Sequence, residues 1–426
     1  MVEAKSSGKP FDIPKQLVWE AYQKVRRNKG AAGVDGQTLA DFEADEKNNL
    51  YRIWNRMSSG SYFPPPVRAV EIPKAGGRGT RVLGVPTVAD RIAQTVVTMV
   101  LEPKVEPMFH PDSYGYRPNR SALDAVAMCK QRCWQAAWVI DLDIQAFFDT
   151  VPHEPILKAV AKHADQPWVL LYVRRWLTAP IQRSDGTLEA RDRGTPQGSA
   201  ISPLLANLFM HYAFDAWLAR AQPMVRFERY CDDAIVHCVS DKQAKYIRNV
   251  IAARLWQFGL KLHPEKTKIV YCKEENRTGT HPVTEFTFLG YTFRPRGART
   301  RGGRLGVGFL PAVSKAAQKE MACTIRGWRL GRRTDLSFRD IATMINRVVA
   351  GWINYYGRFY KSLLIAFLAN RINPHLVRWA MRKYKHLHRY PAKARKRLAQ
   401  IASTYKGMFV HWRHGALPSG STSGAV

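Results

Sequence analysis

The sequence lacks acidic residues at its C-terminal end. Residues 341–426 contain 15 lysines and arginines and no aspartate or glutamate. Over all 426 residues, 66 Lys and Arg stand against 34 Asp and Glu, a formal net charge of +32. Such an excess of positive charge attracts polyanions, so nucleic acid is the expected partner and a membrane surface is the weaker alternative.

Long apolar runs and paired cysteines are also missing. No apolar run approaches the roughly 18 residues of a membrane-spanning helix, so we expect no membrane partner. The first residues, MVEAKSSGKPFDIPKQL, contain no apolar signal core, which predicts a cytosolic protein. The six cysteines form no CxxC pair, which argues against a disulfide framework or a zinc ribbon. Cys129 and Cys133 are expected to be two buried thiols.

What the chain does contain is an alternation of elements followed by helices alone. Predicted strands and helices alternate through residue 295, and a helix over 241–260 is expected to be capped by Asp241. After about residue 310, helical periodicity dominates, with apolar residues at 341, 344, 345, 348, 349, 352, 356 and 359. This change predicts a separate, strongly basic helical domain.

Two groups of aspartates are candidates for chemistry. Asp141, Asp143 and Asp149 lie in DLDIQAFFD, and Asp232 and Asp233 lie in a predicted hairpin turn. Carboxylates about 4 Å apart repel by several kcal/mol at intermediate dielectric, and divalent Mg²⁺ with its oxygen ligands removes that repulsion. Two such ions can clamp a phosphoryl transfer. A solvated turn with a helix-capping aspartate is the alternative, and spacing alone leaves both open.

Longer sequence blocks carry a family resemblance. RYCDDAIV, DLDIQAFFDTVPH and GTPQGSAISPLLANLF resemble the palm of a reverse transcriptase. EIPKAGGRGTRVLGVPTVADRIAQ, DSYGYRPNRSALDA, GLKLHPEKTKIV and FTFLGYTF resemble blocks of group II intron-encoded reverse transcriptase/maturases. NKGAAGVDG resembles their N-terminal extension and INRVVAGWINYYGRF their maturase segment, so the resemblance covers roughly residues 20–400.

The resemblance implies an α+β right-hand polymerase, in which fingers and palm with an antiparallel sheet precede an all-helical thumb/maturase domain. The implied domains are a helical N-terminal extension (1–62), fingers and palm (63–305), an RNA-binding thumb/maturase domain (306–400) and a short basic tail (401–426) with a disordered end. The last cysteine is Cys323, and about 25 residues follow the basic helices. We therefore expect the subclass that lacks the C-terminal endonuclease.

The resemblance also assigns the candidate catalytic residues. Asp143, Asp232 and Asp233 match the family's catalytic aspartates, and Asp143, Ile144 and Asp232 match its metal site. The implied cofactor is a pair of Mg²⁺ ions, with Mn²⁺ as a substitute. Cys231 stands where the family usually has alanine, and its effect on catalysis is left open.

Four residues match the family's nucleotide contacts. Lys74 and Arg81 lie on the two arms of a glycine-rich hairpin and match the triphosphate contacts. A P-loop is excluded there because no Gly-Lys-Ser/Thr follows. Phe148 matches the bulky residue that excludes a ribose 2′-hydroxyl, and Gln197 of TPQGS matches a polar contact of the template and nucleotide pocket. Either Lys266 or Lys268 could act as the general acid toward pyrophosphate, or be a solvated lysine.

Near the C-terminus, cations are interleaved with aromatics, a pattern that favours binding to phosphates and unpaired bases. The alternative is a solvated charged face over a helical core, with Trp379 buried. Tyr355, Tyr356 and Phe359 are expected to be core residues. The predicted RNA-binding residues are Arg378, Arg382, Lys383, Lys385, Arg389, Arg395, Lys396 and Arg397.

The predicted function is RNA-directed DNA polymerisation. The enzyme would copy intron RNA into DNA from a DNA primer, and it would bind intron RNA to assist splicing and mobility. The expected partners are intron RNA, a duplex of RNA template and DNA primer, target DNA and dNTPs. The alternatives are a domesticated reverse transcriptase of DNA repair or defence, and a non-enzymatic RNA-binding splicing cofactor.

Overall fold

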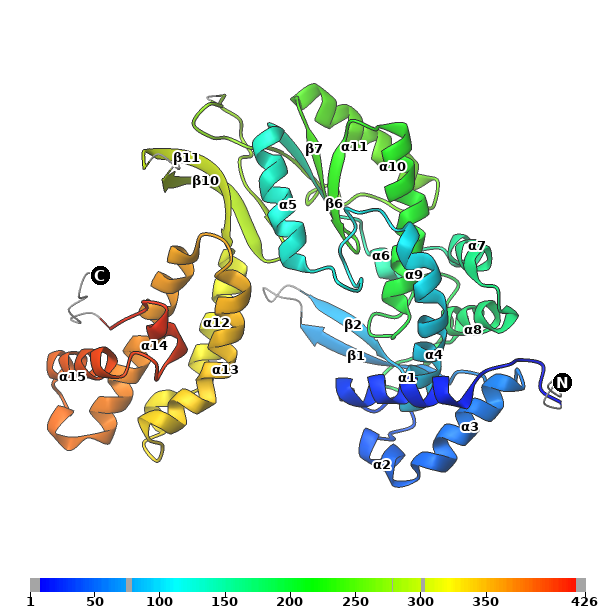
Figure 1. The fold of residues 1–426 in the computed structure, drawn as a ribbon, viewed down its shortest axis with the longest axis horizontal. Coiled ribbons are helices and arrows are strands. Elements are labelled where there is room, and N and C mark those ends of the chain that lie inside the picture. The colour runs from blue at the N-terminus through cyan, green and yellow to red at the C-terminus, as the bar shows by residue number, and fades with distance from the viewer. Residues whose placement is uncertain (1–7, 74–78, 278, 300–302, 419–426) are drawn as a thin grey trace, which may run out of the picture. The chain divides into compact units, whose positions relative to one another are not determined.

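A computed structural model describes residues 8–73, 79–277, 279–299 and 303–418, and Figure 1 shows its elements. The chain folds as two compact units. The first combines the chain up to Ala125 with Trp138–Ile269, and the second combines Val126–Ala137 with the chain from Val270 onward.

The first unit begins with three helices that end where turn-forming residues interrupt the apolar pattern. Helix α1 (Lys15–Asn28) buries Val18, Ala21, Tyr22 and Val25, a spacing that places all four on one helical face. The loop after α1 needs its glycine, because a Cβ at Gly33 would lie 2.6 Å from the backbone nitrogen of Thr87. The next two helices are α2 (Leu39–Ala44) and α3 (Glu46–Ser58).

A four-stranded sheet in the order β2-β1-β4-β5 follows. Strands β1 (Val67–Pro73) and β2 (Thr80–Val85) are antiparallel, and their last pair, Pro73 with Thr80, shows that the glycine-rich segment joins two arms of a hairpin. Lys74 lies outside the described residues. Strand β4 (Ile181–Gln182) runs parallel to β1, and β5 (Leu188–Glu189) pairs with β4.

A second four-stranded sheet, in the order β6-β7-β3-β8, carries the aspartates. Its central strands β3 and β7 are antiparallel and almost fully buried, as their Val- and Ile-rich sequences predict. The chain passes from the first unit to the second within β8. The strands are β3 (Trp138–Leu142), β6 (Arg226–Tyr230), β7 (Asp233–Cys238) and β8 (Lys268–Tyr271).

Helix α11 (Asp241–Trp256) packs against β3 and β7. Its N-cap is Ser240, whose hydroxyl accepts a hydrogen bond from the Gln243 amide, so the predicted cap at Asp241 is corrected by one residue. A serine oxygen reaches the free amides of the first turn from the residue that precedes it, whereas Asp241 already has helical backbone.

The further helices up to β8 are α4 (Val88–Val105), η1 (Glu106–Met108), α5 (Ala122–Gln135), α6 (Phe147–Thr150), α7 (His153–His163), α8 (Pro167–Thr178), α9 (Ser202–Met210), the π-helical turn η2 (His211–Asp215) and α10 (Ala216–Ala221).

The second unit holds a three-stranded antiparallel sheet, in the order β11-β10-β9, and then helices. Strands β10 (Tyr291–Arg299) and β11 (Leu305–Val313) pair along their whole length, and β9 (Phe286–Phe288) pairs with the start of β10. The expected boundary between residues 305 and 306 therefore falls inside a hairpin, and the helices begin at Lys315. They are α12 (Lys315–Gly327), η3 (Leu330–Arg332), α13 (Phe338–Tyr356), α14 (Lys361–Lys383), η4 (Lys385–Leu387), α15 (Pro391–Thr404) and α16 (Val410–Arg413).

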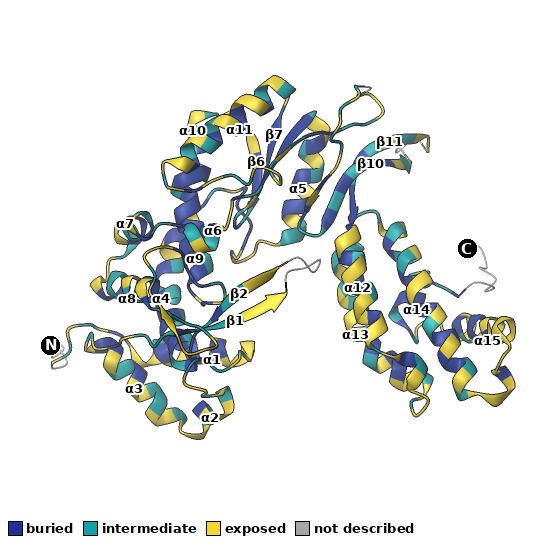
Figure 2. Cartoon of the chain, turned by 180° about the vertical axis from the view of Figure 1, so that it is seen from behind, coloured by how far each residue is buried: buried dark blue, intermediate teal, exposed yellow. Residues whose placement is uncertain are grey.

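The helices of this unit bury one face each, and Figure 2 shows buried and exposed residues alternating along them. Phe409 and Trp412 are fully or almost fully buried in the same core as Leu364 of α14. The expected short tail from residue 401 is thus, up to residue 418, part of the packed core, because its aromatic residues gain more by burial than by exposure. The end that was expected to be disordered, 419–426, lies outside the described residues.

Two absences can be stated for the described ranges. No helix there is both long and apolar enough to cross a membrane. The six cysteines, all within those ranges, form no disulfide, and Cys129 and Cys133 are buried as predicted. Tyr355, Tyr356 and Phe359 pack around the buried ring of Tyr291 but are themselves only half-buried, and of the three Tyr356 packs against the helical core.

Candidate active site

The hairpin β6–β7 reverses direction over two residues. Tyr230 pairs with Asp233, so Cys231 and Asp232 form the tight turn. Cys231 has a left-handed backbone with φ of 62°. A non-glycine residue in this conformation costs about 1–2 kcal/mol and persists where its surroundings hold it.

Strand register brings the aspartates together. Asp141 lies opposite Ile235 and Leu142 opposite Ala234, so the next step along both strands sets Asp143 opposite Asp233. Burial, and next the charge of Asp143, raise the pKa of Asp232. Burial, followed by the charges of Asp232 and Asp143, also raises the pKa of Asp233. The residue Asp233 is nevertheless accessible to water, which weakens this repulsion.

The fourth carboxylate, Asp141, lies on the same side of β3. Burial raises its pKa to about 7, with Asp233 as the next cause, while Lys268 acts in the opposite direction. The Asp143 side chain is more open, at 32% exposed, and Lys266 places its ammonium nitrogen 3.4 Å from the Asp143 Oδ2 atom. Of the two lysines left open by the sequence, Lys266 is therefore the one that contacts Asp143.

The end of β3 is fixed by the segment that precedes β8. The Asp143 carbonyl accepts a hydrogen bond from the His263 amide at 2.8 Å, and the Asp143 amide donates to Thr267 Oγ1 at 3.3 Å. Ile144 is buried and forms an isolated antiparallel bridge with Leu262. These contacts hold the backbone of Asp143, while its side chain stays partly exposed to solvent.

The predicted nucleotide contacts are linked through the backbone. The Thr195 amide donates to the Phe148 carbonyl at 2.7 Å, and the Gly84 amide donates to the Gln197 carbonyl at 2.8 Å. Gly84 lies three residues after Arg81 on β2, so Phe148, Gln197 and Arg81 come from segments that are directly joined. The charge of Arg81 acts against the raised pKa of both Asp232 and Asp233.

Gly198 shows why the loop needs glycine. Its φ is 113°, and a Cβ there would lie 2.7 Å from the Gly84 carbonyl oxygen. Only a residue without a side chain lets the loop approach β2 this closely.

Three residues that the sequence did not single out belong to this region. Gln94 accepts hydrogen bonds from the Ser199 hydroxyl at 2.7 Å and from the Ala200 amide at 2.9 Å, and so holds the Gln197 loop. Tyr116 has a left-handed backbone, and its ring lies 6.0 Å from that of Tyr230. Its pKa is raised by burial and then by the turn residues. It lies within the block DSYGYRPNRS, which was the available signal.

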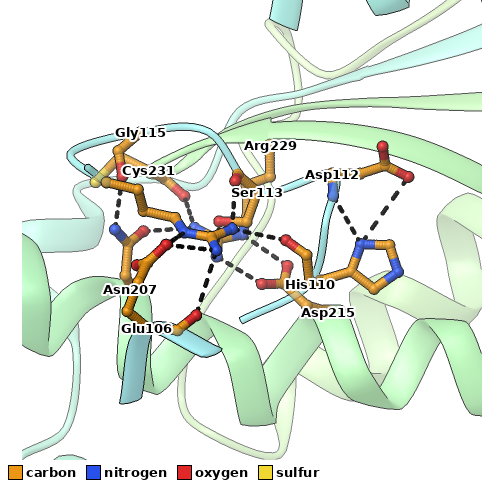
Figure 3. A network of polar contacts seen from close by, with 10 residues as sticks. Glu106, His110, Asp112, Ser113, Gly115, Asn207, Asp215, Arg229 and Cys231 are labelled. Atoms are coloured by element: carbon orange, nitrogen blue, oxygen red, sulfur yellow. Dashed lines mark hydrogen bonds and ion pairs between the residues drawn. The ribbon is translucent and has the colours of Figure 1, made fainter. Parts of the chain in front are cut away.

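The third missed residue is Arg229, which adjoins the turn and is fully buried (Figure 3). Its Nε and Nη2 atoms donate to the two carboxylate oxygens of Asp215 at 2.7 and 2.6 Å. Its remaining hydrogen bonds reach Asn207 Oδ1 at 3.0 Å, the Cys231 carbonyl at 2.7 Å and Ser113 Oγ at 2.8 Å. The five N–H groups of the guanidinium thus have five hydrogen bonds.

The basic residues of the second unit fall into two classes. Arg382 donates to the Gly331 carbonyl at 3.0 Å, and Lys383 donates to the carbonyls of Thr334 and Leu336 at 2.9 and 2.6 Å. These two side chains hold the loop between α12 and α13. The other six are exposed and have no hydrogen bond or ion pair with any described residue: Arg378, Lys385, Arg389, Arg395, Lys396 and Arg397. Trp379 is buried in the core.

Comparison with known proteins identifies families that match the chain. The model of the family "Reverse transcriptase (RNA-dependent DNA polymerase)" matches residues 72–293, more than half of the chain. The model "Group II intron, maturase-specific domain" matches residues 318–398. A solved structure of telomerase from Candida albicans aligns over 88% of this chain and 68% of its own, at 12% identity and a TM-score of 0.46.

Two curated relatives extend the match. Protein YkfC of Escherichia coli (strain K12) is 31% identical over 352 residues, covering 73% of this chain and 88% of that protein. The group II intron-encoded protein LtrA of Lactococcus lactis subsp. cremoris is 33% identical over 197 residues, covering 46% of this chain and 32% of that protein. The chain has the α+β reverse transcriptase fold with a helical maturase region, and it belongs to the group II intron reverse transcriptase/maturases, a branch of the RNA-dependent DNA polymerase family.

Proposed function

We propose that this protein copies intron RNA into DNA, extending a DNA primer with dNTPs. The observation that carries the proposal is the convergence of Asp143, Asp232 and Asp233 at the β6–β7 turn, where the charge of Arg81 acts against the raised pKa of Asp232 and Asp233. Holding carboxylates this close together costs free energy because like charges repel. Their presence, together with a cation that can bind phosphate, favours phosphoryl transfer over a purely structural turn.

The three carboxylates fit magnesium. They supply hard oxygen ligands. Burial, and next the neighbouring carboxylates, raise the pKa of Asp232 and Asp233, and a divalent cation would relieve that repulsion. Asp143 and Asp232 would hold the metal, together with the Ile144 carbonyl, and Mn²⁺ would substitute. When bound, a pair of Mg²⁺ ions would supply Lewis-acid stabilisation to the attacking and leaving oxygens.

The remaining residues would bind and select the nucleotide. Arg81 would pair with its triphosphate, and Lys74 would be the second triphosphate contact. Phe148 would exclude a ribose 2′-hydroxyl by its bulk, and Gln197 would contact the nucleotide from the neighbouring loop. Lys266, with its proton held beside Asp143, would protonate the departing pyrophosphate.

We further propose that the second unit binds intron RNA and thereby assists splicing and mobility, including contact with target DNA. The match to the maturase-specific model supports this role, as do the six exposed cations without acidic partners. Similarity to LtrA, an intron-encoded protein by name, supports an intron as the source of that RNA.

The two alternatives differ in what they need. A non-enzymatic splicing cofactor would have no use for gathered carboxylates, so their presence counts against it. A domesticated polymerase of DNA repair or defence would need the same active site, and only the RNA encoded beside the gene would separate it from a mobile intron protein. A folded intron there supports mobility.

The test is primer extension on poly(rA)/oligo(dT) with purified protein and Mg²⁺. Asp232→Ala should abolish synthesis, while Asp165→Ala, at an exposed acidic residue paired with Lys104, serves as the matched control and should retain full activity. RNA affinity should be unchanged in both. Full-rate synthesis by Asp232→Ala would rule out the proposed metal role of that residue.

A further inference from the structure

The guanidinium of Arg229 is the most completely bonded charged group beside the turn. It has no exposed surface, and each of its donors reaches a different oxygen or a different side of one carboxylate. The partners come from three places in the first unit: Asn207 from α9, Asp215 from the end of η2, and Ser113 from the segment before α5 (Figure 3). No one of these segments is adjacent to the turn in sequence.

One of the five bonds acts on the turn itself. Arg229 donates to the carbonyl of Cys231, the peptide group that joins Cys231 to Asp232. Holding this carbonyl fixes the direction in which the next residue leaves the turn. The bond therefore reaches Asp232 through one peptide unit, and Arg229 needs no contact with substrate to influence that carboxylate.

A second contact on the turn comes from Gly115. A Cβ at Gly115 would lie 2.6 Å from the Cys231 nitrogen, so the backbone at Gly115 presses directly on the turn. Asn207 donates its amide to the Gly115 carbonyl at 2.6 Å while its oxygen accepts from Arg229. The same asparagine thus links both contacts, and together they account for a cysteine that stays in a left-handed backbone.

We propose that Arg229, anchored by Asp215 and Asn207, is a positioning residue that sets the β6–β7 turn and with it the direction of Asp232. The inference rests on the proposed metal role of Asp232. A merely structural ion pair would affect the whole unit equally. A positioning group instead affects the turn first, and misplacing a ligand by about 1 Å can lower a rate by about 100-fold.

The test uses two variants and a matched control. Arg229→Lys keeps the charge but cannot make five bonds. The double variant Arg229→Met with Asp215→Leu replaces the buried pair by apolar side chains, an exchange that often preserves stability. The control is Arg175→Lys, since Arg175 also donates to backbone carbonyls in the first unit, but to those of Gly60 and Tyr62, which lie outside the turn.

The first readout needs neither metal nor activity. Hydrogen–deuterium exchange of the peptide 228–235 in metal-free protein should be faster in both Arg229 variants and unchanged in the control. The second readout is primer extension against Mg²⁺ concentration. The maximal rate should fall by about 100-fold and the half-saturating Mg²⁺ should rise several-fold, with primer–template affinity within about twofold.

The outcomes are distinct. Unchanged exchange at the turn, or exchange that rises equally throughout the first unit, overturns the positioning role. If exchange at the turn is faster in the variants but the wild-type protein itself fails to extend primers, the positioning role stands and the proposed function is refuted instead. If both variants fail to fold, Ser113→Ala replaces them, because it removes one of the five acceptors of Arg229. The same two quantities are measured, and unchanged hydrogen exchange at the turn would overturn the inference.

Discussion

Charge is used in opposite ways in the two units. Beside the β6–β7 turn, Arg229 and Asp215 are fully buried and fully hydrogen-bonded. In the second unit, Arg395, Lys396 and Arg397 lie exposed on α15, in a stretch without any acidic residue. A buried charge must find partners, and so it fixes a geometry, whereas an exposed charge without partners stays available to an outside polyanion.

Arg382 and Lys383 combine features of both groups of charges. They belong to the basic stretch by sequence, yet they donate to loop carbonyls as Arg229 does. The difference teaches that a run of cations in the sequence mixes residues that hold the protein together with residues that can face a ligand. The predictions below separate the two uses.

The largest effect is expected at the carboxylates. Asp143→Asn should lower the rate of DNA synthesis by about 1000-fold, roughly 4 kcal/mol, because an amide cannot replace a charged metal ligand. RNA affinity should stay within about twofold of wild type. Single-turnover primer extension and filter binding measure the two quantities, and a parallel loss of RNA affinity would contradict the separation of roles.

The next effect concerns the exposed cations. Replacing Arg395, Lys396 and Arg397 by Gln should weaken RNA binding by about 10-fold near physiological salt and reduce the slope of log affinity against log salt by about 2. Binding isotherms at several salt concentrations measure both.

The matched control for that experiment is the pair Arg382→Gln and Lys383→Gln. Loss of three hydrogen bonds to the α12–α13 loop should lower the free energy of unfolding by about 1–3 kcal/mol, with a much smaller change in salt slope. Equal salt slopes in both sets of variants would show that the two classes of cation are not distinct.

A smaller effect is expected at the nucleotide pocket. Phe148→Ala should raise ribonucleotide incorporation relative to deoxynucleotide incorporation by about 10-fold, because the ring no longer excludes the 2′-hydroxyl. The ratio of kcat/KM values for dNTP and rNTP measures it. An unchanged ratio would leave Phe148 as a packing residue that only fixes the 195–199 loop.

The smallest effects are opposite pH slopes of stability. In the first unit, Asp90 accepts hydrogen bonds from Tyr62 and Trp176, and burial raises its pKa to about 6. Between the unfolded value of 3.8 and about 6 the folded state binds more protons, so this contribution to stability is present at low pH and is lost as the pH rises.

In the second unit, His411 contacts Asn373, and burial lowers its pKa to about 3. The unfolded state then binds more protons between about 3 and 6.5, so stability is lost as the pH falls. Asp90→Asn and His411→Gln should each flatten one slope, of at most about 1.4 kcal/mol per pH unit. Hydrogen exchange of peptides from each unit would measure them, and equal slopes before and after substitution would contradict the assignment.

Much of the fold was predictable from periodicity. The apolar pattern of 341–359 predicted α13, and the alternation of strands and helices predicted through residue 295 is found in the first unit, where β3 precedes α6 and α7. The packing of the segment after residue 401 was harder to predict. Phe409 and Trp412 are too few to form a periodic pattern, and only their burial in the core shows that this segment is part of it. The N-cap of α11 was predicted one residue too late, at Asp241 instead of Ser240, because the choice depends on a local hydrogen bond and not on the apolar pattern.

The candidate site divides in the same way. The sequence singled out Asp143, Asp232 and Asp233, and the register of β3 and β7 brings them together, although their roles stay predictions. It passed over Gln94, Tyr116 and Arg229, whose importance depends on what they contact. None of the three carries a motif of its own beyond the block in which it lies.

By itself, the sequence determined the kinds of chemistry available: adjacent carboxylates in one short segment, a basic C-terminal end, and the family to which these belong. The tertiary structure alone decided which groups meet. Arg229 bonds to Asp215, Asn207 and Ser113, which lie 14, 22 and 116 residues away along the chain. Hydrogen bonds act over about 3 Å in space and carry no mark of sequence separation, so only the folded chain reveals that an arginine sets the turn beside Asp232.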